Sequence, residues 1–169
     1  MNKIYDYNFK SRVCNESKFT GSDLTKYKGD IFDLADAFLY ISSMTHKKLQ
    51  KLCFYAKAWY LAIYDTNLIT EDFEAWVHGA VQPKLYQKYK IYGFGYIPRV
   101  MDIRGIPEEF LSFAREIYDS YGELNGDELE KLNHSEKPWL EARGDLKPWQ
   151  NSEHIISEVT MKEFYREMI

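Results

Sequence analysis

The chain has 169 residues, of which 45% are hydrophobic and 28% charged, an ordinary composition for a folded protein and one that argues against long disorder. A net charge of −4 at pH 7 and a pI near 5.6 give no overall attraction to phosphate backbones, so nucleic-acid binding is disfavoured. Two cysteines are too few for a disulfide framework, and no apolar run approaches a membrane span or a signal peptide, so we expect a cytoplasmic protein without membrane contact.

Residues 1–29 mix polar and charged residues with scattered aromatics and show no sustained periodicity. We interpret them as an N-terminal arm or irregular leader. The alternation of Tyr5, Tyr7 and Phe9 favours one edge strand, and a poorly ordered terminus explains it equally well. Tyr5 and Tyr7 are also candidate partner-binding residues, because tyrosine gives adaptable contact area at low entropic cost.

Order begins at Asp30, which predicts an N-cap for a helix with apolar residues at helical spacing from Ile31 to Ile41. Thr45 is expected to cap a second helix. The apolar residues of this second helix cover a wide arc of its surface. They are Leu49, Leu52, Cys53, Tyr55, Ala56, Trp59, Tyr60 and Ile63. We therefore place this helix at the centre of the fold, and we expect Cys53 to be a buried thiol.

A short strand is predicted at residues 73–78, where polar residues alternate with aromatic and branched ones until Gly79. Pro83 suits the first turn of a third helix, Lys84–Tyr92, because a backbone N–H is not needed there. A Gly-rich and Pro-containing segment, 93–98, then leads to Arg99–Ile103. That segment is the expected partner strand in a small hairpin.

Pro107 and Gly122 mark the start and the end of a fourth predicted helix, and a shorter helix is expected from Asp127 onward. The segment with the pairs Pro138-Trp139 and Pro148-Trp149 is interpreted as irregular.

Thr160 and Glu163 have the spacing of a capping box at the start of the last helix. The sequence patterns over residues 30–169 therefore predict a single compact, mainly α-helical domain. Its features are a central hydrophobic helix and a small β-hairpin.

The histidines do not have the close helical spacing of common metal sites; they are His46, His78, His134 and His154. His46 and Cys53 lie two turns apart, and two ligands do not make a site. No Gly-rich phosphate loop or hydrolase elbow occurs in the sequence. We therefore expect neither a metal nor a cofactor.

One acidic cluster, Glu71, Asp72 and Glu74 with His78, has the residue types of an acid–base site. Alternation along a strand places Trp76 between Glu74 and His78, and no nucleophile is evident nearby. We therefore expect no catalytic residues and a protein that is not an enzyme.

Four basic residues crowd the first turns of the second predicted helix, where the helix end already carries positive potential: His46, Lys47, Lys48 and Lys51. Each uncompensated cation there costs roughly 0.3 to 1 kcal/mol. Compensation by the acidic residues of the preceding helix, Asp30, Asp33 and Asp36, is the favoured explanation. The alternative is an acidic or phosphate-bearing partner, which makes the four basic residues candidates for partner binding.

Three sequence blocks follow one another in a specific order. The first is the helical stretch Met44–Ala62. The second, Asp72–Tyr86, is similar to the pattern E-A-W-x-x-G-P-V-x-P-x-x-Y, and the third, His134–Arg143, to H-x-x-x-P-W-x-x-A-R. Together they resemble the Panacea domain of antitoxins, also called SocA-like, or GepA-like from phage and prophage proteins, over roughly residues 30–169. Ala80 replaces the usual proline after Gly79, which puts the rigidity of that turn in question.

The resemblance implies an antitoxin that neutralises the protein toxin of a two-gene pair by direct contact. The family is associated with many unrelated toxins. One studied member instead delivers its bound toxin to a Clp-type protease, so proteolytic delivery is a second outcome of the same binding. A DNA-binding regulator and a small enzyme remain as alternatives, and the lack of an appended helix-turn-helix module weakens the first of them.

We expect the residues of the three blocks to form scaffold rather than interface, with Trp76 and Trp139 as core anchors. These structural motif residues are Trp59, Trp76, His78, Gly79, Pro83, His134, Pro138, Trp139 and Arg143. Partner contacts then fall on variable surfaces. Besides the arm and the basic cluster, the candidate is the segment from Tyr89 through Lys90 and Ile91 to Tyr96, with Tyr89, Tyr92 and Tyr96 as its candidate binding residues.

Overall fold

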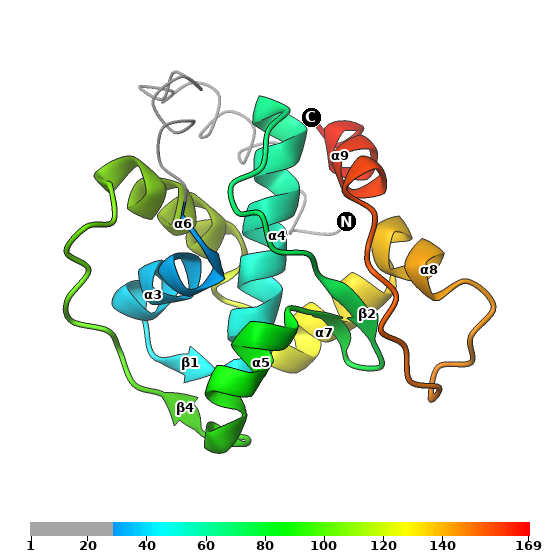
Figure 1. Ribbon diagram of the computed structural model, residues 1–169, viewed down its shortest axis with the longest axis horizontal. Helices are drawn as coiled ribbons and strands as arrows, with labels where there is room; N and C mark the ends of the chain where they lie inside the picture. The colour runs from blue at the N-terminus through cyan, green and yellow to red at the C-terminus, as the bar shows by residue number, and fades with distance from the viewer. Residues whose placement is uncertain (1–28) are drawn as a thin grey trace.

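The computed structural model describes residues 29–169, so the predictions for the N-terminal arm, Tyr5 and Tyr7 included, lie outside the described residues. Within the described range the chain forms seven α-helices and two antiparallel sheets of two short strands each (Figure 1). The prediction of a mainly α-helical fold with a small β component is confirmed.

The elements have the following bounds. The helices are α3 (Ile31–Ile41), α4 (His46–Tyr64), α5 (Pro83–Tyr89), α6 (Glu108–Tyr121), α7 (Gly126–His134), α8 (Lys137–Arg143) and α9 (Glu158–Arg166). The strands are β1 (Met44–Thr45), β2 (Glu74–Trp76), β3 (Gly79–Val81) and β4 (Tyr96–Ile97), and a 3₁₀ turn, η2 (Lys90–Tyr92), follows α5.

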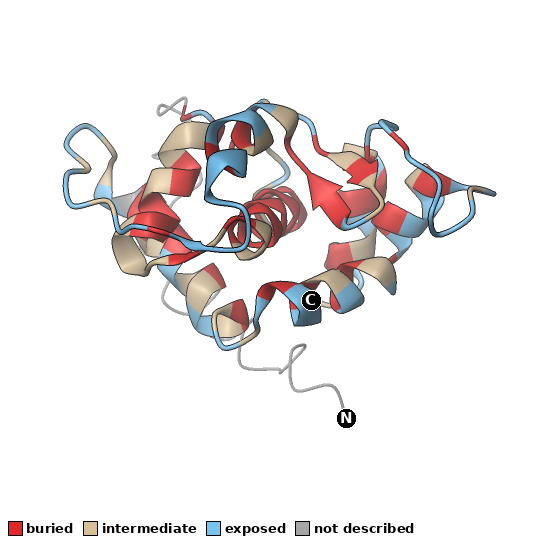
Figure 2. Ribbon diagram, turned by 90° about the horizontal axis from the view of Figure 1, so that it is seen from below, coloured by how far each residue is buried: buried red, intermediate tan, exposed pale blue. Residues whose placement is uncertain are grey.

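Helix α4 is the centre of the fold, as predicted. It begins after Thr45, whose hydroxyl accepts a hydrogen bond from the Lys48 backbone N–H at 3.3 Å. Every residue from Leu49 to Ala62 is buried. Figure 2 shows α4 nearly end-on, buried on all sides and surrounded by the other elements. In Figure 1, α3 and α6 lie on one side of it and α8 and α9 on the other.

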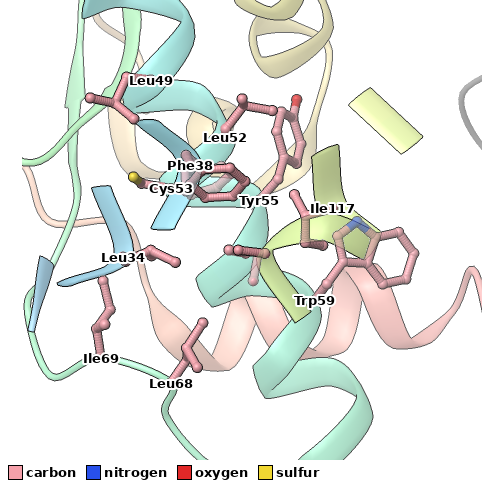
Figure 3. Close-up of a cluster of buried hydrophobic side chains, with 14 of the residues drawn as sticks. Leu34, Phe38, Leu49, Leu52, Cys53, Tyr55, Trp59, Leu68, Ile69 and Ile117 are labelled. Atoms are coloured by element: carbon pink, nitrogen blue, oxygen red, sulfur yellow. The ribbon is translucent and has the colours of Figure 1, made fainter. Parts of the chain in front are cut away.

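The apolar core surrounds α4, and the part of it between α3, α4 and α6 is shown in Figure 3. There Phe38 of α3 and Ile117 of α6 lie beside α4, and both are fully buried. Asp30 caps α3 through its predicted side-chain contacts, with Asp33 completing a capping box. Cys53 is buried as expected, and burial raises the pKa of its thiol well above the usual value.

The prediction that Arg99–Ile103 pairs with strand β2 is wrong. β2 pairs with β3, which follows it directly, and the register sets Trp76 opposite Gly79. Two residues connect the strands and Gly79 has φ of +97°, so the hairpin closes locally with little loop entropy to overcome. Arg99–Ile103 forms no strand; the residues just before it form β4, which pairs with β1.

Two further predictions near the C-terminus are corrected. The segment around Pro138 is helical, because this proline stands in the first turn of α8, where no backbone N–H is required. The last helix is capped by Ser157, whose side chain accepts from the Thr160 backbone N–H, one turn before the predicted cap. The Thr160 hydroxyl instead donates to Glu141 at 2.6 Å.

Candidate functional site

The turn between β2 and β3 is fixed by buried polar groups. The Lys51 ammonium donates to the Ala80 carbonyl at 3.0 Å, and the Asn133 side-chain oxygen accepts from the Ala80 N–H at 2.7 Å. A Cβ atom at Gly79 would lie 2.6 Å from Cε of Lys51 and 2.9 Å from the Asn133 oxygen. Only glycine therefore fits at position 79, both for its backbone angle and for the close approach.

A buried carboxylate, that of Glu136, connects this turn with the centre of the fold. Tyr55 and Tyr165 donate their hydroxyl protons to it at 3.0 and 2.8 Å, from α4 and α9. The Asn133 amide nitrogen donates to the same Glu136 oxygen at 3.5 Å. Burial, reinforced by the Glu136 charge, raises the pKa of Tyr165 well above its usual value, so the phenol keeps its proton.

Residues of the third sequence block clamp the hairpin. The Trp139 indole donates to the Trp76 carbonyl at 3.0 Å. The buried Arg143 guanidinium donates to the Ala75 carbonyl at 3.1 Å and, with its other nitrogen, to the carbonyls of Lys147 and Gln150 at 2.9 and 2.7 Å. One planar cation thus joins the hairpin to the loop after α8.

Three other motif residues, Trp59, Pro83 and His134, make contacts within the scaffold or begin one of its helices. The Trp59 indole donates to the Tyr121 hydroxyl at 2.7 Å. Pro83 is the first residue of α5, and the His134 ring stacks on Trp139 with centroids 4.1 Å apart. Burial lowers the pKa of His134, which therefore favours the neutral ring.

The basic cluster of α4 has other counter-ions than we expected. Lys47 pairs with Asp127 and Glu130 of α7 at 2.8 and 2.7 Å. Burial works against the charged ammonium, yet the hydrogen bonds to both carboxylates raise the pKa of Lys47. Asp30 and Asp33, two of the expected counter-ions, instead cap α3.

Of the other three basic residues of the cluster, Lys48 contacts the end of α6, whereas Lys51 and His46 are buried. Lys48 donates to the Gly122 carbonyl at 2.5 Å and lies over the Tyr118 ring. Burial lowers the pKa of Lys51 to about 7, and burial with the nearby Lys51 charge lowers the pKa of His46 to about 4. At neutral pH the cluster therefore carries less positive charge than its sequence implies.

The acidic cluster weighed as an acid–base site does not converge on one point. The Glu74 carboxylate accepts from the Trp76 indole at 2.7 Å, whereas Nδ1 of His78 lies 3.1 Å from Glu130. In residues 29–169, no group of three or more His, Cys, Asp or Glu side chains is placed to hold a metal ion. No helix in that range is long and apolar enough to cross a membrane.

Three adjoining cavities mark the surface beside the hairpin. The first, of about 450 Å³, is lined by Trp76, Val77, His78, Trp149, Asn151, Ser152 and Glu153. The second, of about 230 Å³, shares Trp76 and His78 with the first and is otherwise lined by His46, Lys47, Gln50, Lys51, Val81, Tyr86, Gly93 and Phe94. The third, of about 270 Å³, shares Lys47, Gly93 and Phe94 with the second and extends to Asn125–Asp127. We call this series the Trp76–Phe94 groove.

The groove has an exposed aromatic side chain near each end. Phe94 is 99% exposed and Trp149 is 75% exposed. Tryptophan and phenylalanine are enriched in protein interfaces, and exposed apolar side chains around a cavity are typical of binding surfaces. The groove is therefore the candidate functional site.

The structure brings only part of the predicted binding set to this groove. His46, Lys47 and Lys51 line it, whereas Lys48 does not. Of the three tyrosines, Tyr89 is buried, Tyr92 is 39% exposed and Tyr96 is 69% exposed.

Sequence reasoning named the segment 89–96 for its tyrosines and did not single out Phe94 or Ile91 within it; Ile91 is 85% exposed. The signal that marks Phe94 is its place between Gly93 and Gly95, in a segment where apolar residues lack helical or alternating spacing.

Comparison with families of known proteins matches residues 49–140, more than half of the chain, to the antitoxin SocA-like Panacea domain. The matched range contains α4 from Leu49 onward, the β2–β3 hairpin, α7 and the start of α8. These elements are joined by the buried contacts of Lys51, Asn133 and Glu136. No curated protein and no solved structure matches the chain.

Proposed function

Because the chain belongs to the SocA-like Panacea domain family of antitoxins, we propose that it neutralises a cognate protein toxin by direct protein–protein binding in the cytoplasm. The observation that supports direct binding is the Trp76–Phe94 groove with Phe94 and Trp149 exposed at its rim. Large aromatic anchors beside apolar cavities supply most of the binding free energy in many interfaces.

A binding role also agrees with the state of the polar groups beside the groove. Lys51 is engaged with the Ala80 carbonyl, and His78 with Glu130. His46 lies 3.2 Å from the Gln50 amide. These contacts stabilise the scaffold, and no acid, base and nucleophile meet among them, so we propose no catalytic activity.

Co-expression tests the proposal. Expression of the protein encoded beside this gene should arrest growth, and co-expression of the present chain should restore it. The complex should also survive copurification through a tag on either protein. Continued arrest in cells that contain the folded chain in excess over that protein would contradict the proposal.

Three exposed apolar side chains outside the groove support the proteolytic adaptor as a second candidate function. Leu140 of α8 is 48% exposed, Ile155 is 58% exposed and Val159 of α9 is 61% exposed. In Figure 1 α8 and α9 lie beside α4, away from α5 and β4 at the lower edge. An adaptor needs two binding surfaces, because it must hold a toxin and a Clp-type protease at the same time.

The amount of toxin separates the two candidates. Direct neutralisation restores growth while the toxin persists at an unchanged level, in cells with or without the Clp protease. Delivery to proteolysis restores growth only when the protease is present, and the half-life of the toxin then shortens.

A further inference from the structure

One flank of the groove carries a charge opposite to that of the whole chain. Between Glu74 and Asp102 the sequence contains no acidic residue, although the net charge of the chain is −4. The same stretch contains the basic residues Lys84, Lys88, Lys90 and Arg99, and all four are exposed. This flank therefore presents positive charge on an acidic protein.

None of these four cations forms a close ion pair within the described part of the chain, although burial raises the pKa of the Asp36 carboxyl and the charge of Lys88 opposes this rise. Lys88 lies over the rings of Phe32 and Tyr89, at 4.8 and 5.1 Å from their centroids. Lys90 donates to a Gln87 side-chain oxygen, and Arg99 donates to the Tyr40 carbonyl. No described carboxylate forms a close ion pair with any of the four, in contrast to Lys47.

Exposed apolar side chains are interleaved with the cations. Ile91 is 85% exposed, Phe94 is 99% exposed and Tyr96 is 69% exposed. We call this region the α5–β4 surface; it consists of Lys84, Lys88, Lys90, Ile91, Tyr92, Phe94, Tyr96 and Arg99. Phe94 joins it to the groove, because its ring lines the cavities of about 230 and 270 Å³. Figure 1 shows α5 and β4 together at the lower edge of the molecule.

We propose that the α5–β4 surface docks the toxin and selects a protein face that combines carboxylates with aliphatic or aromatic side chains. This inference rests on the antitoxin function proposed above. Exposed cations that lack a close ion pair attract a partner of opposite charge and speed its encounter. The exposed apolar side chains then supply contact area that the two proteins bury together.

A nucleic acid is the other class of partner that basic and aromatic residues attract. Two features favour a protein. The pI near 5.6 is far from the strongly basic values of nucleic-acid-binding domains. Ile91, one of the most exposed side chains of the surface, has no ring on which a base can stack.

The first arm of the test replaces Phe94 by alanine and titrates the purified protein encoded beside this gene into the purified variant. Because Phe94 is 99% exposed, the substitution leaves the core intact. We expect the affinity to fall by about tenfold or more. Met101→Ala is the matched control, since Met101 is 77% exposed outside the α5–β4 surface, and its affinity should stay within about twofold of the native value.

The second arm reverses charge with Lys84→Glu and Lys90→Glu together and leaves Lys88 in place, because Lys88 packs over Phe32. The association rate should fall, and its dependence on salt should weaken. The control, Arg115→Glu with Lys137→Glu, makes the same change of charge on the exposed surfaces of α6 and α8 and should leave the rate near its native value.

The outcomes separate this inference from the function on which it rests. If the native chain neutralises the toxin but both sets of variants bind as tightly as their controls, the α5–β4 surface is not the docking site. If the native chain neither binds nor neutralises the toxin, the antitoxin function itself fails. Tight binding of a single-stranded oligonucleotide that Lys84→Glu and Lys90→Glu abolish would overturn the assignment to a protein partner.

Discussion

At the scale of single residues, the hairpin depends on Gly79. Its φ of +97° strains any residue with a Cβ, and that atom would also lie 2.6 Å from Lys51 Cε. We predict that Gly79→Ala lowers the free energy of unfolding by at least about 2 kcal/mol, because strain and steric overlap add. Denaturant unfolding followed by tryptophan fluorescence measures this loss.

Gly105→Ala is the control for the backbone contribution. Gly105 has the same φ of +97°, and a Cβ there meets nothing within 4 Å. The Gly105→Ala substitution should lower the free energy of unfolding by about 1 kcal/mol, from backbone strain alone. Equal losses in the two variants would show that the close approach of Lys51 to Gly79 is not important for stability.

The buried Lys51 makes the stability of the protein depend on pH. Burial lowers its pKa in the fold to about 7, from an ordinary value of 10.5. Between these values the unfolded chain binds the proton more tightly than the folded one, so the folded state gains stability as the pH rises. We predict that native protein gains on the order of 1 kcal/mol per pH unit relative to Lys51→Met from pH 7 to 10.

Unfolding titrations of both proteins at several pH values measure this effect. The hydrogen bond to the Ala80 carbonyl contributes an offset between the two curves, whereas the proton linkage changes their slope. Parallel curves from pH 7 to 10 would contradict a lowered pKa of Lys51 in the folded state.

Residue types alone did not reveal which side chains face the groove. Lys47, Lys48 and Lys51 stand close together in the sequence, yet one pairs with α7, one contacts the end of α6 and one is buried. Their helical positions were predictable, but their partners come from residues some 30 to 80 positions away along the chain. Tertiary packing therefore decides the charge that each one presents.

At the scale of elements, the hairpin and the loop after α8 are held by Arg143. Its two terminal nitrogens reach the carbonyl of Ala75 and those of Lys147 and Gln150. A lysine ammonium cannot span both sets, so Arg143→Lys should leave buried carbonyls without a donor. We predict a loss of stability of about 2 kcal/mol and faster amide exchange in β2 and residues 147–154, measured by mass spectrometry.

Arg166→Lys is the control for this prediction. Arg166 donates to the Ala62 carbonyl through one nitrogen, and its side chain is 47% exposed. Its replacement should change exchange rates little and only near α9. Unchanged exchange in β2 and the loop of the Arg143→Lys variant would show that the clamp is not needed to order them.

The helices were predictable because their signals are local. Asp30 and Thr45 cap α3 and α4 as predicted, and apolar spacing sets the buried faces. The strand predicted at residues 73–78 contains β2, but the strand pairings were not predicted, since a pair as short as β1 with β4 depends on contacts across about 50 residues. α8 was missed because the two Pro-Trp pairs favoured an irregular segment, whereas a proline in the first turn is compatible with a helix.

At the scale of the whole molecule, the three sequence blocks of the family form one scaffold. The first supplies α4, the second the hairpin, and the third the Trp139 and Arg143 contacts that hold the hairpin. The α5–β4 surface lies largely outside these blocks and carries Phe94 and four exposed cations that form no close ion pair with a described carboxylate. The docking surface that we propose is thus carried mostly by residues that the scaffold contacts do not use.

The most direct test of the account is to titrate the purified chain into its purified toxin and to measure the toxin's activity with no other protein present. We predict that activity falls to background once the chain reaches a fixed stoichiometric ratio, and that Phe94→Ala moves the curve to higher concentrations. A toxin that stays fully active in saturating native chain would contradict neutralisation by direct binding.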